Sequence, residues 1–429
     1  MTPPSLSRRT FLASTAAIAA AGLSTGAAPR PRQRKRIALI GTESRTHSHA
    51  QHFIDRFLRG YAWEGGWHEP AVDLASLYID QFPEGDLARG QASRYDVPIY
   101  PSIAEALTMG TSGLAVDGVV IIGEHGRYPR NELGQHLYPR FEFFKQVIEV
   151  FEESGRSVPV FNDKHLSTEW DRCVEMVEDS RRLGFPFLAG SSLPVTWRMP
   201  AVDLPYDADL VESVCVGYGG PDSYDFHGLE TAQCMSERRR GGEVGIARVQ
   251  ALRGDALWSM LEGRESTARL FLAALCRSHT LPVEDGYPTD PPSIDWARRN
   301  FDDPFAYDIE HRDGFRTTLF MMPVIRDFTY AGLIGDADAV VSCQMYLPMP
   351  GRAASTADFF NPLINHIERM VVEGHAPYPV ERTLLTSGMT MAGVTSLARD
   401  GEVVETPEME VRYAAPRDSL FVNAPGAES

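Results

Sequence analysis

The sequence predicts an α/β protein in which a Rossmann-like, doubly wound parallel sheet is followed by an α+β domain with a large, mostly antiparallel sheet. Three observations predict this fold. Short apolar runs alternate with amphipathic segments over residues 36–195, a pattern typical of parallel strands joined by crossover helices. After about residue 196, long extended stretches replace this alternation. Among them, Asp313-Gly314 separates two alternating segments and indicates a hairpin turn.

The composition limits which kinds of protein this can be. The chain has 429 residues, 43% hydrophobic and 23% charged, with a net charge of −17. This is the balance of a folded chain with ample material for a core. The acidic excess argues against a nucleic-acid binder, which needs a basic face to neutralise phosphates. After the N-terminus no apolar run reaches the length that spans a bilayer.

The first 28 residues have the pattern of an export signal. Arg8 and Arg9 precede a weakly apolar, alanine-rich stretch, and small residues at 26–28 follow it. The paired arginines resemble a twin-arginine (Tat) signal, which serves chains that fold before export. We therefore expect cleavage near Ala27 or Ala28 and a periplasmic or extracellular location. The alternative interpretation is a fraying amphipathic helix.

Strands and helices alternate in the predicted Rossmann-like domain. Gly155 and Gly184 follow the last two helices and are good C-terminal stops. The predicted strands are 36–41, 72–79, 117–123, 158–161 and 185–190, and the predicted helices are 48–58, 103–107, 141–154 and 168–183.

The second half of the chain has a different pattern. One predicted helix, 229–238, begins just after His227, and another, 360–373, ends at Gly374. The predicted extended stretches are 210–217, 244–252, 305–323 and 339–347. The domains expected from these patterns are 1–28 (signal peptide), 29–35 (basic linker), 36–195 (Rossmann-like) and 196–429 (α+β, for substrate binding and oligomerisation).

Polar side chains follow the predicted parallel strands at the edge of the sheet where ligands bind. They are residues 42–47 after the first strand, Glu124 and His125 after the third, 162–165 after the fourth, and 191–192 after the last. We expect them to surround a pocket. Ordinary solvated loops are the alternative.

Several of these segments, taken in order, resemble the glucose–fructose oxidoreductase / inositol dehydrogenase / MocA (Gfo/Idh/MocA) family over most of residues 36–415. Each resembles one family feature: the first strand and glycine turn (37–47), the "DaVvI" strand (117–122), the E-K-P motif (163–166), the segment with the catalytic histidine (225–230) and the C-terminal signature (375–379 and 406–413).

This resemblance implies an NAD(P)-dependent oxidoreductase that acts on a hydroxyl or ketone of a sugar or polyol. Lys164 would position the reacting oxygen and His227 would move its proton. Asp163, in place of the family's glutamate, would hold the lysine charged. The resemblance also implies a homo-oligomer, because the family often self-associates through the open face of the large sheet.

The nucleotide-binding turn departs from the family pattern. Gly41 matches the first glycine, but Glu43 stands at the second and Thr46 at the third. A side chain at the second position adds bulk, and a carboxylate adds negative charge, where the backbone approaches the pyrophosphate. The cofactor-binding residues predicted for NAD or NADP, including Arg45 for phosphate and Asp80 for ribose, are Gly41, Glu43, Ser44, Arg45, Asp80 and Glu124.

Further departures concern the catalytic motifs. His165 replaces the proline of E-K-P, and Ser223 stands where the family often has an aspartate four residues before the histidine. Asp222 and Asp225 flank Ser223, so a shifted carboxylate is an expected substitute. With these departures, a lyase, hydratase or hydrolase on the same fold is an alternative function, and a carbohydrate-binding protein is another.

Histidines and carboxylates near the predicted pocket raise the question of a metal. His47, His49 and His52 form H-x-H-x-x-H, but on a helix only the last two share a face. A second set is Glu124, His125, Asp163, His165 and His227, whose residue types suit a divalent ion. We predict hydrogen-bonding pocket residues and no metal, with a metal-dependent enzyme as the alternative.

The five cysteines give little sign of a structural role. Their number is odd and no CxxC pair occurs. We expect buried free thiols, and one disulfide after export is the alternative.

Overall fold

A computed structural model describes residues 34–282, 292–335, 338–348 and 356–424. The predicted signal peptide and residues 29–33 of the predicted linker lie outside the described residues. From Lys35 onward the chain forms one compact unit.

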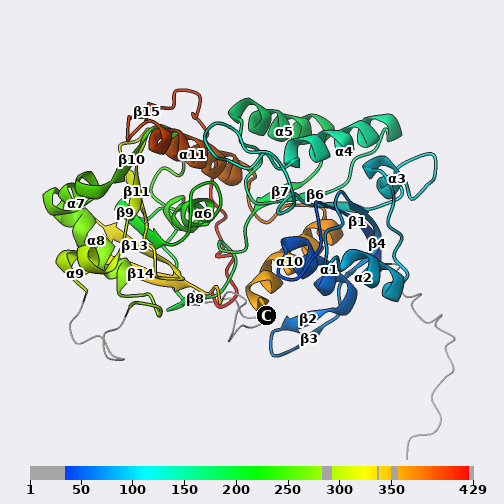
Figure 1. The fold of residues 1–429 in the computed structure, drawn as a ribbon, viewed down its shortest axis with the longest axis horizontal. Helices are drawn as coiled ribbons and strands as arrows, with labels where there is room; N and C mark the ends of the chain where they lie inside the picture. Colours follow the sequence, from blue (N-terminus) through cyan, green and yellow to red (C-terminus); the bar gives the residue numbers. More distant parts are fainter. Residues whose placement is uncertain (1–33, 283–291, 336–337, 349–355, 425–429) are drawn as a thin grey trace, which may run out of the picture. The chain divides into compact units, whose positions relative to one another are not determined.

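The first sheet is parallel, as predicted, with strand order β4-β1-β5-β6-β7 (Figure 1). The order reverses between β1 and β5, the kind of switch point where ligands bind in open α/β sheets. The strands are β1 (Lys35–Gly41), β4 (Val72–Ile79), β5 (Gly118–Ile122), β6 (Val160–Asp163) and β7 (Phe187–Gly190).

Helices cover both faces of this sheet, because alternate residues of each buried strand point to opposite sides. Ile37 and Leu39 pack with α1 (His49–Arg59), α2 (Ala88–Tyr95) and α10 (Asn361–Glu373). Ala38 and Ile40 pack in the core that contains the other helices, which are α3 (Ile103–Thr108), α4 (Arg140–Ser154) and α5 (Trp170–Leu183). Left-handed Gly155 and Gly184 end α4 and α5 as predicted.

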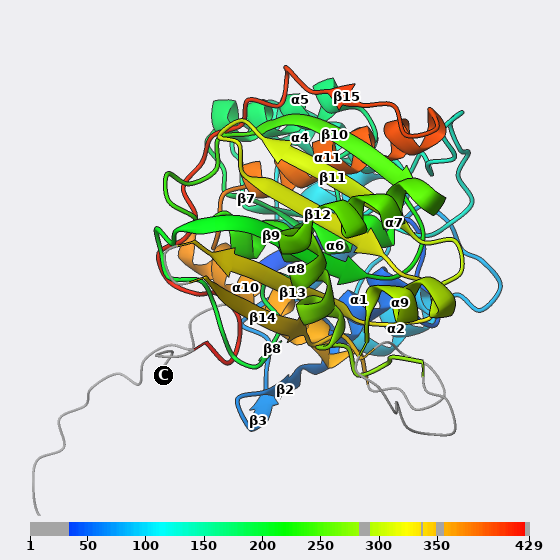
Figure 2. The same ribbon diagram turned by 90° about the vertical axis from the view of Figure 1, so that its left-hand side faces the viewer.

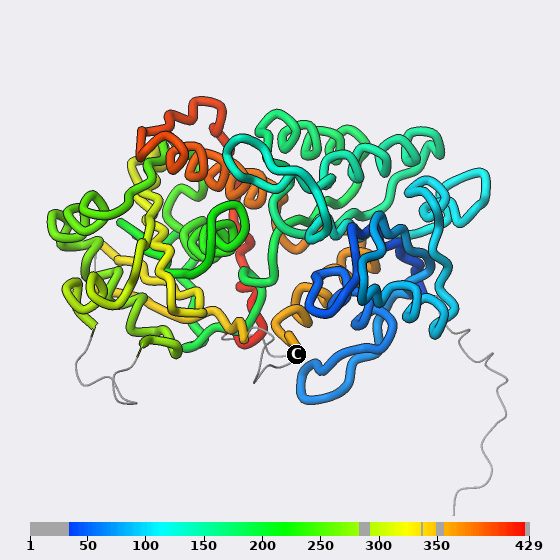
Figure 3. Tube along the Cα trace, viewed as in Figure 1, coloured from blue at the N-terminus to red at the C-terminus, as the bar shows by residue number. Residues whose placement is uncertain are grey.

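Helix α10 joins the parallel sheet from the far end of the sequence. It follows the second sheet in the chain, yet it contacts α1 and β4, and Figure 3 shows it beside α1. A short hairpin of β2 (Tyr61–Trp63) and β3 (Gly66–His68) lies after α1, and β2 also contacts α10. The first core is therefore completed by residues from the predicted second domain.

The second sheet is mostly antiparallel, as predicted, with one parallel pair between β12 and β9. Gly314 closes the predicted turn between β11 and β12 with a left-handed backbone, φ 83°. In sheet order the strands are β15 (Val404–Glu405), β10 (Ile246–Arg253), β11 (Phe305–His311), β12 (Arg316–Met321), β9 (Leu210–Gly217), β13 (Phe328–Ile334), β14 (Ala339–Met345) and β8 (Arg198–Met199).

Helices also lie on both faces of the second sheet, which corrects the expectation of an open face. Helices α6 (Tyr224–Ser236) and α11 (Glu381–Ala398) pack on one side. On the other side lie α7 (Gly254–Gly263), α8 (Glu265–Leu275) and α9 (Ile294–Asn300) (Figure 2). Their apolar side chains share a core with Val214, Phe320 and Ala331. Helices therefore cover both faces of these strands, and the homo-oligomer stays a prediction.

Three smaller findings complete the fold. Helix α6 begins at Tyr224, so His227 lies inside its first turn and not before the helix as predicted. All five cysteines lie in described segments and are free; Cys276 is exposed and the others are buried, so no disulfide forms. In the described part of the chain, no helix is long and apolar enough to cross a membrane.

Candidate functional site

Half of the predicted polar residues line one cavity of about 280 Å³ beside the carboxyl ends of the parallel strands, whereas residues 42–46, 162 and 165 do not. Asp163 and Lys164 enter it from the end of β6, Glu124 and His125 from the segment after β5, and His227 from α6. The other lining residues are His47, His49, His52, Ser191, Ser192, Ser223, Tyr224, Leu347, Phe359 and Phe360. The predicted catalytic residues are therefore together, with Glu124 of the predicted cofactor set.

Lys164 and His227 form a hydrogen-bonded pair, with 2.6 Å between Nζ and Nε2. Burial, followed by the charge of Lys164, holds the pKa of His227 well below its usual value, so the ring is neutral. A neutral ring that accepts from the ammonium at Nε2 carries its proton on Nδ1. That Nδ1 is buried and has no hydrogen-bond partner among the described residues.

Asp163 bonds a histidine and not the neighbouring lysine, which corrects its predicted role. It is 1% exposed, and its Oδ2 lies 2.7 Å from Nδ1 of His49. Its other oxygen, Oδ1, is buried without a partner in the described segments. This histidine comes from the first turn of α1, whose N-terminus is capped by Ser48.

Glu124 is a charged carboxylate at the wall of the cavity. Burial alone would raise its pKa, but the charges of Lys164 and Arg140 outweigh burial and hold the pKa well below its usual range. Its Oε2 lies 2.7 Å from Nη2 of Arg140. The same guanidinium contacts Nε2 of His165 at 2.9 Å, so His165 supports the ion pair and is absent from the cavity lining.

Two further histidines of the cavity, His125 and His52, are neutral. Burial, then the nearby His49, lowers the pKa of His125 to about 4, and burial, then Arg56, lowers that of His52 to about 3. The described residues contain no group of three or more His, Cys, Asp or Glu arranged to hold a metal ion. The neutral rings of His125 and His52 can donate or accept hydrogen bonds from a ligand.

Three cavity residues other than glycine have a left-handed backbone. They are His47 (φ 65°), His125 (φ 71°) and Lys164 (φ 68°). Each such conformation costs roughly 1 kcal/mol or more and tends to occur at functional sites. The clustering of this strain around one cavity marks it as the candidate site.

The predicted Asp222 and Asp225 do not substitute for the family's aspartate. Asp222 accepts from the Gln135 side chain and the His136 backbone, at 2.9 and 3.0 Å. Asp225 accepts backbone N–H groups at the start of α6 and the hydroxyl of Tyr307. Each carboxylate therefore has a structural partner, and the hydrogen bond of His227 is made by Lys164.

Two of the predicted cofactor-binding residues after the first strand, Glu43 and Arg45, are paired with each other. Glu43 is 5% exposed, and its Oε1 accepts from Nε of Arg45 at 2.6 Å. Gly41 ends β1 in a tight space, since a Cβ there would lie 3.2 Å from the Ile79 side chain. The hydroxyl oxygen of Ser44 is buried and has no partner within the described ranges. None of these four residues lines the cavity.

Asp80, the predicted ribose ligand, is occupied by two tyrosines. It accepts from the hydroxyl of Tyr78 at 3.0 Å and from that of Tyr128 at 2.6 Å. Beside it, Gln81 accepts from the backbone N–H of Arg127 at 2.9 Å and donates to its carbonyl at 3.3 Å. Since β1 lies between β4 and β5, these contacts tie the loop after β5 to the end of β4 across the end of β1. We call this loop, residues 123–139, the crossing loop.

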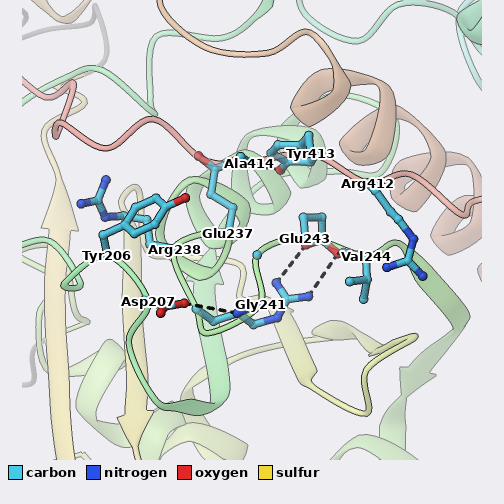
Figure 4. A pocket seen from close by; sticks show the side chains of 12 residues that line it. Tyr206, Asp207, Glu237, Arg238, Gly241, Glu243, Val244, Arg412, Tyr413 and Ala414 are labelled. Atoms are coloured by element: carbon cyan, nitrogen blue, oxygen red, sulfur yellow. Dashed lines mark hydrogen bonds and ion pairs between the residues drawn. The ribbon is translucent and has the colours of Figure 1, made fainter.

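A second cavity, of about 340 Å³, lies beside the second sheet and is shown in Figure 4. Its charged side chains are bonded within the chain: Arg239 donates to Glu243, and Glu237 accepts from Arg382 and from the hydroxyl of Tyr413. These bonds leave its buried carboxylates satisfied. The cavity at the parallel sheet, with its unpaired polar atoms, is the better candidate for a reaction.

No protein-family model and no curated protein matches the chain, but solved structures share its fold. GenD2 from gentamicin A biosynthesis, in complex with NAD, aligns over 89% of this chain and 99% of its own, with 15% identity and a TM-score of 0.54. The myo-inositol dehydrogenase from Lactobacillus casei, in complex with NAD(H) and myo-inositol, aligns over 90% and 99%, with 10% identity and a TM-score of 0.53.

The myo-inositol 2-dehydrogenase from Lactobacillus plantarum gives 87% and 99% coverage, 12% identity and a TM-score of 0.51. These neighbours are oxidoreductases of the Gfo/Idh/MocA type. The fold expected from the resemblance is therefore confirmed, and at these identities the likeness extends to the fold alone.

Proposed function

We propose that this chain is an exported, NAD(P)-dependent oxidoreductase that acts on a hydroxyl or ketone of a sugar or polyol. The observation that carries the proposal is the Lys164–His227 pair, buried in a cavity at the carboxyl ends of the parallel strands. Solved neighbours with this fold include enzymes crystallised with NAD, one of them also with myo-inositol. Export through the Tat pathway is proposed from the Arg8-Arg9 pattern.

The pair can move the proton of a substrate hydroxyl. A hydroxyl that enters between the two side chains donates to Nε2 of His227 and accepts from Nζ of Lys164. The neutral ring takes the proton as general base, and the ammonium stabilises negative charge that develops on the oxygen. In the opposite direction, the protonated ring returns its proton to the oxygen of a ketone.

Unpaired polar atoms favour a substrate with several hydroxyls. Asp163 Oδ1, His125 Nε2 and His227 Nδ1 belong to cavity residues, and each is buried without a partner in the described segments. Each unsatisfied buried group costs roughly 1–3 kcal/mol. A sugar or polyol supplies both donors and acceptors, so its hydroxyls would recover these costs.

The dinucleotide fits one part of this structure and not the other. When bound it would supply a hydride acceptor or donor, and the cavity of Lys164, His227 and Glu124 would hold its reacting end beside the substrate. At the other end, Glu43 is paired with Arg45, and Asp80 with Tyr128. Those residues do not fit a dinucleotide in this arrangement, so binding requires the crossing loop to release Asp80.

The pairing of Asp80 with Tyr128 and of Glu43 with Arg45 also favours a second candidate function. If the crossing loop stays closed, the cavity retains an acid–base pair and several carbohydrate-binding groups without a hydride partner. The chain would then be a carbohydrate lyase, hydratase or hydrolase.

One set of assays distinguishes the two functions. The full chain is incubated with a panel of inositols and aldoses in the presence of NAD⁺ or NADP⁺, and formation of the reduced cofactor is followed. We expect turnover with at least one polyol, reduced at least about 100-fold in Lys164→Met and His227→Ala with unchanged melting curves. Exposed His375→Ala is the control. Cleavage, dehydration or hydrolysis of a carbohydrate without either dinucleotide, together with no formation of reduced cofactor when they are present, would refute the oxidoreductase and support the second function.

A further inference from the structure

We propose that His49, held by Asp163, is a second proton-transfer residue, and that it removes a proton from the carbon next to the substrate's carbonyl group. The cavity would then catalyse proton exchange on hydroxy ketones, the products of polyol oxidation. This activity goes beyond the proposed function, because it needs no dinucleotide.

The geometry of His49 is that of an oriented base. Its Nδ1 lies 2.7 Å from Oδ2 of the buried Asp163. A carboxylate at this position accepts the Nδ1 proton and leaves Nε2 as the basic nitrogen. Within the described ranges, no side chain or backbone group is hydrogen-bonded to that Nε2. The ring also has edge contacts to Phe360 and His125, at centroid distances of 5.2 and 5.6 Å, which restrict its rotation.

The other candidate bases in the cavity are less suitable. Glu124 is ionised and paired with Arg140, and its low pKa makes it a weak base. His125 has a pKa of about 4 and no hydrogen bond from its ring to a carboxylate in the described segments. His227 is already used by the hydroxyl proton. His49, oriented by Asp163, is therefore a base of the cavity that alcohol oxidation leaves without a role.

The proposed step is balanced without any further reactant. The C–H bond next to the carbonyl breaks, its proton goes to Nε2 of His49, and the electron pair forms a carbon–carbon double bond. The carbonyl oxygen becomes an enediolate oxygen, whose charge the Lys164 ammonium stabilises. After the ring proton exchanges with solvent, its return from the ring to the same face of the same carbon regenerates the ketone, with exchange of the hydrogen and retention of the centre. No atom is oxidised or reduced overall.

Deuterium exchange tests this inference. The full chain is incubated in deuterium oxide with 2-keto-myo-inositol, and in a second sample with dihydroxyacetone, with no dinucleotide added. Proton NMR follows the loss of the signal from the carbon next to the ketone. We expect exchange well above the protein-free rate with at least one of these probes. In His49→Asn, whose amide can still donate to Asp163 but has no basic nitrogen, exchange falls at least about 100-fold.

Controls make the outcomes decisive. Asp163→Asn should lower exchange at least about tenfold, because the ring loses the carboxylate that orients it, whereas His375→Asn, an exposed histidine, should leave it unchanged. Should His49→Asn fail to fold, the Asp163→Asn comparison is decisive. Exchange by wild type at only the protein-free rate would overturn this inference and leave the oxidoreductase proposal standing. Exchange by a chain that binds no dinucleotide would support this inference and overturn the oxidoreductase proposal.

Discussion

Removal of the Tyr128 hydroxyl is expected to strengthen dinucleotide binding. In the present structure this hydroxyl donates to Asp80 at 2.6 Å, at the position expected to bind the cofactor's ribose. The bond must break before Asp80 can accept from a ribose hydroxyl, so its free energy opposes binding. Tyr128→Phe removes the competing bond and leaves the ring and the crossing loop in place.

The size of the effect follows from the strength of that bond. A hydrogen bond to a charged group contributes roughly 1.5–3 kcal/mol. Because this one is exposed to solvent, we take roughly 1 kcal/mol, which corresponds to about a fivefold change in affinity. We therefore expect Tyr128→Phe to lower the dissociation constant for NAD⁺ or NADP⁺ about fivefold. The free energy of unfolding should fall by roughly 1 kcal/mol, since the closed state loses the same bond.

Calorimetric titration of the full chain measures the first effect, and urea denaturation measures the second. Tyr206→Phe is a matched control, because Tyr206 lines the second cavity, away from the parallel sheet. An unchanged or weaker affinity in Tyr128→Phe would show that the contact between Tyr128 and Asp80 does not compete with the cofactor. The account of the crossing loop would then be refuted.

Three further predictions concern stability and export. Burial raises the pKa of Glu230 from 4.5 to about 7; because the folded state holds its proton more tightly, stability should fall as pH rises from about 4.5 to 7. Glu230→Gln should flatten this slope and stabilise the chain at pH 8 by roughly 3 kcal/mol, as measured by urea denaturation at each pH; an unchanged slope would refute the assignment. Arg382→Met should remove the guanidinium that lies 2.5 Å from the buried Glu237 carboxylate. The unpaired buried charge should lower the free energy of unfolding by roughly 3–5 kcal/mol in the same assay. A loss below about 1 kcal/mol would contradict this prediction. Arg8→Lys combined with Arg9→Lys should retain the chain in the cytoplasm of its host on cell fractionation, and normal export would contradict the Tat proposal.

The first sheet could be predicted because its strands are continuous apolar runs in the sequence. Buried parallel strands have apolar residues on both faces, so 36–41 and 117–123 read as apolar runs with a glycine at the end. The amphipathic helices between them end at Gly155 and Gly184, which adopt the left-handed conformation that glycine favours. Local chemistry was sufficient there.

The helices of the second half lack such signals. Helix α11 is buried on nearly all sides, so it has no polar stripe, and its threonine, serine and glycine residues are weak helix formers. No side chain caps α7 or α8. Leu257, Leu261 and Phe271 do have helical spacing with their neighbours, and that pattern could have found α7 and α8. Because α7 and α8 have no capping residue to mark where they begin, the sequence analysis did not predict them, and the face of the second sheet that they cover was expected to be open.

The sequence could predict which residues lie in the candidate site, but not which of them are hydrogen-bonded to one another. Strand ends of one parallel sheet meet at one edge, so Glu124, Asp163 and Lys164 could be expected together. The bond between Asp163 and His49 depends on how α1 is placed, and the bond between Asp80 and Tyr128 depends on the path of the crossing loop. Neither path follows from local sequence. The first pairing is the basis of the proposed role of His49, and the second occupies the predicted ribose ligand Asp80.

Calorimetric titration of the folded full chain with NAD⁺ and NADP⁺ measures whether the proposed oxidoreductase binds its cofactor. We expect saturable binding of at least one of them, close to one per chain, and tighter binding when Tyr128 is replaced by Phe. A chain with an intact melting transition that binds neither dinucleotide, as wild type or as Tyr128→Phe, would contradict the claim that this fold works as an NAD(P)-dependent oxidoreductase.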